Sequence, residues 1–167
     1  MTSGGIFGPK LSGKTTLAVA ISRQYYVSQG IRSLVLDPHL ENWGGQALAT
    51  ADEEKFWGMV WKSKNCLIIV EEAAATIRRE RELVPVFTRL RHNQHKLIIV
   101  GHSGMDLLPV MRQQLDELYL FRQPASATAV WAEVFTQDEL LNSVSLAQFE
   151  FLHTRLYGSC RRLKLKK

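Results

Sequence analysis

The sequence contains few cysteines and no long hydrophobic run. Only Cys66 and Cys160 occur among its 167 residues, and they lie far apart in the chain. A disulfide-rich fold is therefore excluded, and we expect two free thiols in a reducing compartment. No apolar run approaches the roughly 20 residues of a transmembrane helix, and the first residues lack the basic and apolar regions of a secretory signal. We expect neither a membrane span nor a signal peptide.

Acidic residues are missing from the C-terminal end of the chain. The C-terminal end, residues 155–167, contains six basic residues and no acidic one. The whole chain has a net charge of +5, so residues 1–154 have a net charge of −1. Such a basic block is typical of a contact with the phosphate backbone of a nucleic acid, and equally of a solvated terminus that maintains solubility. The basic residues are Arg155, Arg161, Arg162, Lys164, Lys166 and Lys167.

Short apolar runs alternate with longer amphipathic ones, which predicts an α/β fold with a mostly parallel sheet. Strands are expected at 4–7, 33–36, 66–70, 95–100 and 116–122, and a terminal hairpin from 149–155 and 161–166. Helices are expected at 16–28, 51–61, 73–93 with a break near Pro85, and 106–115. A further helical segment is expected at 128–142, with 136–139 as an alternative second start, and a loop with some helical turns at 40–50. Without repeats or linkers, residues 1–167 are expected to form one domain, with a nucleotide-binding core at 1–123 and a C-terminal helix and basic hairpin or tail at 124–167.

The most informative stretch follows the first expected strand. Gly8 and Gly13 let the backbone turn and approach a ligand closely, and the following helix directs its N-terminal amides at an anion. Lys14 is placed to reach the β- and γ-phosphates of ATP, Thr15 to hold Mg²⁺, and Thr16 to extend the nucleotide contacts. The alternative is a chance glycine turn before a helix. The residues that fit the phosphate-binding loop pattern are Gly8, Pro9, Lys10, Leu11, Ser12, Gly13, Lys14 and Thr15.

Two carboxylates, Glu71 and Glu72, end the apolar strand at 66–70. In a protein with a phosphate-binding loop this is the Walker B position, where the first acid holds the magnesium shell and the second polarises the attacking water. The alternative is a pair of acids that favour the dipole of a following helix. Asp37, at the end of another strand, is expected to cap the next turn, with a role near water or magnesium as the alternative.

Arginines and a histidine complete the candidate site. Arg89 and Arg91 precede a strand without nearby acids, and either is a candidate for an arginine finger that enters a neighbouring subunit's site. His102 and Ser103 follow the strand at 95–100, where a polar residue can touch the γ-phosphate. A structural role for His102 is the alternative. The cluster Arg78, Arg79 and Arg81 is available for DNA or for a neighbouring subunit.

The order of these features resembles the HerA–FtsK superfamily of DNA-translocating ATPases, most closely its small members such as the genome-packaging ATPases of tailless, internal-membrane phages. The resemblance covers residues 3–123. It departs from the pattern at Glu71, where Asp is commoner, and at His102, where many relatives have Gln. The segments that carry it are the loop at 8–15, the strands ending in Leu36-Asp37-Pro38 and in Glu71-Glu72, the arginine stretch at 89–92, the segments 97–103 and 106–112, and the strand at 116–122.

The resemblance implies a RecA-like (ASCE) P-loop NTPase that hydrolyses ATP with Mg²⁺ and moves double-stranded DNA through a hexameric or other ring. By this match Lys14, Thr15, Glu71 and Glu72 take their usual roles, and Arg112 joins Arg89 and Arg91 as a finger candidate. Portal or packaging-vertex proteins would be partners, in the host cytoplasm or at the packaging vertex of the virion. Two other functions stay open: a small-molecule P-loop kinase, and a nucleotide-dependent switch that does not hydrolyse ATP.

Overall fold

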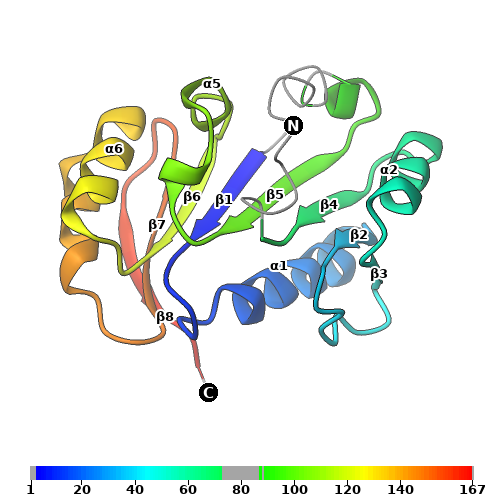
Figure 1. Ribbon diagram of the computed structural model, residues 1–167, viewed down its shortest axis with the longest axis horizontal. Helices are drawn as coiled ribbons and strands as arrows, with labels where there is room; N and C mark the ends of the chain where they lie inside the picture. Colours follow the sequence, from blue (N-terminus) through cyan, green and yellow to red (C-terminus); the bar gives the residue numbers. More distant parts are fainter. Residues whose placement is uncertain (1–2, 73–86, 88, 167) are drawn as a thin grey trace.

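A single mixed sheet of eight strands forms the centre of the part that the computed structural model describes, which comprises residues 3–72, 87 and 89–166 (Figure 1). The order across the sheet is β3-β2-β4-β5-β1-β6-β7-β8. The strands are β1 Ser3–Phe7, β2 Ser33–Leu36, β3 Ala47–Thr50, β4 Leu67–Val70, β5 Lys96–Gly101, β6 Glu117–Phe121, β7 Glu150–Arg155 and β8 Arg161–Lys164. The α-helices are α1 Lys14–Gln29, α2 Glu53–Lys62, α5 Pro109–Arg112 and α6 Ala125–Phe135, and the 3₁₀ helices are η1 Gly104–Asp106 and η2 Asp138–Ser145.

The register of the parallel strands brings several strand ends to one edge of the sheet. Strands β1 to β6 run parallel, whereas β7 and β8 are antiparallel to their neighbours. Phe7 of β1 lies opposite Gly101 of β5, and Val70 of β4 lies opposite both Ile99 and Leu36. The segments that follow β1, β2, β4 and β5 therefore meet at the carboxyl edge, where open α/β sheets bind their ligands.

Two apolar clusters cover the two faces of the sheet. Ile6 and Ile69 pack with Leu17 of α1 in one cluster, while their neighbours Phe7 and Ile68 belong to the other, which includes residues of α2 and α6. Successive strand residues point to opposite faces, so a strand buried on both faces reads as a continuous apolar run. Among the described residues, none of the helices could form a transmembrane span.

The α/β architecture, the mostly parallel sheet and the C-terminal hairpin agree with the sequence-based prediction. The prediction of a loop throughout 40–50 is wrong, because Ala47–Thr50 forms the edge strand β3. The single helix expected at 106–115 is instead η1 followed by α5, which Pro109 opens. The helical segment expected at 128–142 is divided: α6 ends at Phe135, since Thr136 is left-handed with φ of 53°, and η2 begins at Asp138, within the second start expected at 136–139. Most of the helix expected at 73–93 lies outside the described residues.

A buried carboxylate joins the antiparallel strand β7 to β6. One oxygen of Glu117, whose side chain is 5% exposed, accepts hydrogen bonds from His153 Nε2 at 2.7 Å, Arg155 Nε at 2.9 Å and the Tyr119 hydroxyl at 3.0 Å. Burial opposes ionisation of Glu117, but these hydrogen bonds outweigh it and lower the pKa of the carboxyl below its ordinary value. Ionised Glu117 therefore stabilises the attachment of the terminal hairpin.

We expect Glu117→Gln to lower the free energy of unfolding at pH 7 by about 2 kcal/mol, because it removes the charge that three donors share. The pKa of Glu117 is lower in the folded chain, so its contribution is present above the unfolded pKa and is lost as pH falls through the folded pKa. Urea unfolding at pH 7 and near pH 3.5 measures both effects. Glu150→Gln, at the Glu150–Arg162 pair, in which Arg162 is exposed and Glu150 is half-buried, is the control and should change stability less. An equal loss for Glu117→Gln at both pH values would contradict this account.

Candidate nucleotide-binding site

The loop between β1 and α1 is a tight, glycine-containing turn that leads directly into the N-terminus of α1. Its first amide, on Gly8, donates to Gly101 O of β5 at 3.3 Å, and Leu17 N donates to Gly13 O at 2.9 Å where α1 begins. Gly13 has a φ of 102°, a left-handed conformation that favours glycine. The first turn of α1 contains no acidic residue, so the positive end of the helix dipole is available for phosphate.

Gly8 has no room for a side chain. A Cβ atom there would lie 2.5 Å from Phe121 Cβ and 2.9 Å from Ser12 Oγ. The loop therefore folds back tightly over the end of β6, and this close approach requires glycine.

The Lys14 side chain lies across the loop. Its Nζ donates to Pro9 O at 2.8 Å. Partial burial lowers the pKa of Lys14, while the charges of Glu71 and Glu72 act in the opposite direction. The ammonium group is thus held at the loop by a neutral carbonyl acceptor, which a phosphate oxygen can replace.

The loop and the two acids share one cavity of about 80 Å³. Glu71 is buried, which raises the pKa of its carboxyl to about 7; a hydrogen bond from Thr15 and the charge of Lys14 oppose the rise, and Asp37 and Glu72 add to it. The cationic and the acidic halves predicted from separate motifs therefore face each other. The cavity is lined by Lys14, Thr15, Asp37, His39, Glu41, Glu71, Glu72, Val100, Gly101 and His102.

Thr15 and Glu71 suit a magnesium ion, because hydroxyl and carboxylate oxygens are the hard donors that Mg²⁺ prefers. Both residues line the same cavity. Within the described ranges, no group of three or more His, Cys, Asp or Glu residues could hold a metal. An ion here would take its remaining ligands from water and nucleotide phosphates, as Mg²⁺ commonly does.

Asp37 caps the turn after β2, as expected. Its carboxylate accepts hydrogen bonds from His39 N at 2.9 Å, Glu41 N at 2.7 Å and Trp43 Nε1 at 2.9 Å. The cap places His39 at the cavity, where its Nε2 lies 3.0 Å from Glu72 Oε1. His39 is three residues after the end of β2, and no local sequence pattern singles it out, because its contact with Glu72 depends on the pairing of β2 with β4.

The two residues proposed as sensors differ in their surroundings. His102 is exposed and lines the cavity, and its carbonyl accepts a hydrogen bond from Gln123 Nε2 at 2.9 Å. The Ser103 hydroxyl instead accepts from Met105 N at 3.2 Å and caps η1. Because β5 lies between β1 and β4, His102 lies between the loop and the acids, and it is the better placed of the two.

None of the finger candidates lines the cavity of its own chain. Arg89 and Arg91 are exposed and precede β5, so they lie at the amino edge of the sheet, opposite the phosphate-binding loop. The Arg89 guanidinium stacks on the Trp61 ring, 4.4 Å from its centroid. Arg112 Nη1 donates to Gly104 O at 2.9 Å, which ties it to η1. Arg78, Arg79 and Arg81 lie outside the described residues.

The C-terminal segment packs against the phosphate-binding loop. Gln148 Nε2 donates to Leu11 O at 3.2 Å, and Leu165 N donates to Phe149 O at 2.9 Å. A Cβ atom on Gly13 would lie 2.6 Å from Leu165 Cδ1 and 3.2 Å from Phe149 Cδ1. The basic end of the chain is therefore adjacent to the loop (Figure 1), a contact that local sequence patterns do not reveal.

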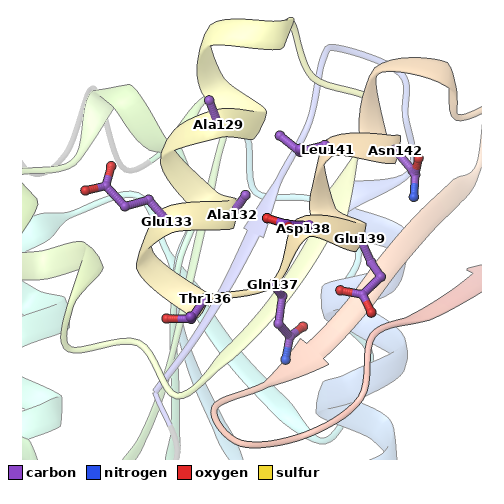
Figure 2. A pocket seen from close by; sticks show the side chains of 9 residues that line it. All are labelled: Ala129, Ala132, Glu133, Thr136, Gln137, Asp138, Glu139, Leu141 and Asn142. Atoms are coloured by element: carbon purple, nitrogen blue, oxygen red, sulfur yellow. The ribbon is translucent and has the colours of Figure 1, made fainter.

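A larger surface hollow of about 960 Å³ lies elsewhere, between α6 and η2 (Figure 2). Its lining includes the carboxylates of Glu133, Asp138 and Glu139 but no Lys or Arg, so it offers a triphosphate no positive charge. Gln137, also at its edge, is engaged within the fold, because its Nε2 donates to Gly158 O and its Oε1 accepts from the Thr154 hydroxyl. The smaller cavity at the loop, which contains Lys14 and Thr15, is therefore the candidate nucleotide site.

No family model and no curated protein matches the sequence. Among solved structures, the genome packaging NTPase B204 of Sulfolobus turreted icosahedral virus 2, in complex with AMPPCP, is similar with a TM-score of 0.78 and 17% identity over 98% of this chain and 96% of that one. The cytoplasmic domain of the type VII secretion ATPase EccC of Thermomonospora curvata gives 0.68 and 11%, over 97% and 25%. VirB4 of Thermoanaerobacter pseudethanolicus gives 0.56 and 14%, over 76% and 43%. The expected structural resemblance is confirmed, and the chain has the P-loop fold shared by these packaging and secretion ATPases.

Proposed function

We propose that this protein is an ATPase that moves double-stranded DNA, as the packaging motor of a viral genome. One observation carries the proposal: Lys14 of the loop and the Glu71–Glu72 pair line the same cavity. Support for the DNA substrate comes from the similar fold of B204, the DNA-packaging ATPase of Sulfolobus turreted icosahedral virus.

Hydrolysis requires water to attack the γ-phosphorus while the bond to the β–γ bridging oxygen breaks. As the water oxygen bonds to phosphorus, Glu72 accepts a proton from that water molecule. The products are ADP and inorganic phosphate. The loop amides and Lys14 hold the phosphates and stabilise the negative charge of the transition state. Thr15 and Glu71 would hold Mg²⁺, which supplies further charge neutralisation when bound.

The site of one subunit is completed by its neighbour in a ring, under this proposal. Arg89 and Arg91 lie at the opposite edge of the sheet from their own loop, so either can reach a γ-phosphate only in another copy. Arg89 is held by its stacking on Trp61, whereas Arg112 is hydrogen bonded within its own chain. We therefore retain Arg89 and Arg91 as finger candidates and place Arg112 behind them.

Duplex DNA should stimulate release of inorganic phosphate from ATP several-fold, whatever its sequence. The basic residues of the C-terminal end would contact backbone phosphates, and such contacts weaken steeply as salt rises from about 50 to 200 mM. Steady-state phosphate release with duplexes of unrelated sequence, at both salt concentrations, measures the effect. Transfer of phosphate to a small acceptor would instead indicate a kinase. ATP binding without turnover, with and without DNA, would indicate a switch.

A further inference from the structure

The C-terminal part of the chain supports the phosphate-binding loop through side chains that the proposed chemistry does not use. Gln148 Nε2 donates to Leu11 O at 3.2 Å, and Leu165 Cδ1 lies only 2.6 Å from where a Cβ atom on Gly13 would be. Leu11 has a φ of 60°, a left-handed conformation that a leucine rarely adopts. Such conformations persist where surrounding contacts hold them, and the C-terminal segment supplies two of these contacts.

Leu165 is fixed to the sheet by its backbone and by its side chain. Its N–H donates to Phe149 O at 2.9 Å, which extends the pairing of β8 with β7 by one residue. Its side chain packs in the apolar cluster on the α1 face, which includes Phe121 and Phe151. Because Leu165 also touches Gly13, where α1 begins, a displacement of β8 would be transmitted to the loop.

Strand β8 also carries much of the positive charge of the C-terminal end. It is an edge of the sheet, all four of its residues are exposed, and three of them are basic. Successive residues of a strand point to opposite faces, so Arg162 and Lys164 point away from the face on which Leu165 packs. Arg162 pairs with Glu150, and a backbone phosphate can compete for this surface ion pair. The same short strand therefore presents cations on one face and continues into the loop contact on the other.

We propose that Leu165 is a positioning residue that couples DNA to the nucleotide site, so that contact of β8 with backbone phosphates strengthens the binding of ATP. A phosphate backbone that holds β8 restricts the loop that Leu165 touches. ATP then binds a loop that is already held in place, which lowers the cost of ordering it. By linkage, ATP strengthens the binding of DNA by the same factor. This inference rests on the proposed function and names the contact through which DNA would regulate the site.

The test measures binding of a non-hydrolysable ATP analogue with Mg²⁺ to the full chain by isothermal titration, with and without saturating duplex DNA. In wild type, DNA should lower the dissociation constant of the analogue about fivefold, and the analogue should lower that of DNA by the same factor. Leu165→Ala removes the contact with Gly13 and keeps every charge. Its coupling factor should fall below about twofold, while its DNA affinity without nucleotide stays within about twofold of wild type.

Two further variants separate the contact from a general effect on the strand. Leu165→Met keeps the volume and reach of the side chain and should restore the wild-type coupling factor. Leu163→Ala removes a leucine from the same face of β8, opposite Phe151, and should also couple as wild type does. If Leu165→Ala fails to fold, Gln148→Ala, at an exposed side chain, breaks the other contact with the loop and should lower the coupling factor as well.

Equal coupling in wild type and Leu165→Ala would overturn the proposal, because the effect of DNA would then come from charge alone. It would also be overturned if DNA left the affinity of wild type for the analogue unchanged, or if Leu165→Ala lost DNA binding in the absence of nucleotide. Failure of the proposed function is distinguishable, since wild-type protein would then release no phosphate from ATP or would bind no duplex DNA.

Discussion

Replacing Glu72 with glutamine should lower ATP turnover by about 100-fold to 10,000-fold while ATP still binds. Glutamine keeps the size of the side chain and an oxygen acceptor for His39, but it cannot take a proton from water. The phosphate-binding contacts come from Lys14 and the loop, which the change does not alter. Steady-state phosphate release, together with equilibrium binding of a fluorescent ATP analogue, separates turnover from affinity.

The matched control is Glu133→Gln, which makes the same chemical change on α6, at the hollow remote from the loop. Its turnover and affinity should equal those of wild type. If Glu72→Gln retained turnover, another group would have to be the base, and the assignment of the acid pair would be wrong. If Glu72→Gln lost ATP binding as well, Glu72 would be a binding residue instead.

Lys14→Ala should weaken ATP binding by about 30-fold or more, because it removes a partly buried charge from the phosphates. The ammonium group is held over the loop by Pro9 O, so the fold of the loop does not depend on an ion pair that the substitution would break. Isothermal titration with ATP and Mg²⁺ measures the loss, and a melting curve shows whether the chain remains folded.

Lys62→Ala, in the last turn of α2, removes an equal charge far from the cavity and should bind ATP as wild type does. Equal affinity of Lys14→Ala and wild type would show that the triphosphate does not occupy the loop. A similar loss in both variants would indicate a general effect of net charge instead.

Much of the fold could be predicted because buried parallel strands have a plain signature. Runs such as Leu67–Val70 are buried on both faces, so they are apolar without interruption. The edge strand Ala47–Thr50 lacks this signature, since two alanines contribute little and Leu48 is 56% exposed. Its strand conformation comes from pairing with β2, a tertiary effect that the segment alone does not encode.

The core of the site could be predicted because its chemistry is concentrated in two short motifs. The loop requires glycine at positions of tight approach or positive φ, and the acids directly follow an apolar strand. His39 could not be recognised in the same way, because its contact with Glu72 depends on which strands are neighbours in the sheet. The same applies to Gln148 and Leu165, which reach the loop from more than 130 residues away.

The arginine finger could not be predicted from the sequence or from one chain, because it would act in the site of a neighbouring subunit. Within one chain, Arg89 and Arg91 lie at the far edge of the sheet, and only the arrangement of neighbouring subunits decides which of them reaches a γ-phosphate. Neither a local sequence motif nor the fold of a single chain contains that arrangement.

The measurement that tests the central claim most directly is an experimental structure of the full chain with Mg²⁺ and a non-hydrolysable ATP analogue. We predict that the γ-phosphate lies within hydrogen-bond distance of Lys14 Nζ, about 3 Å, with Glu71 at the ion and Glu72 facing a water beside the γ-phosphorus. A triphosphate bound away from the loop, or a γ-phosphate remote from Glu71 and Glu72, would contradict the account.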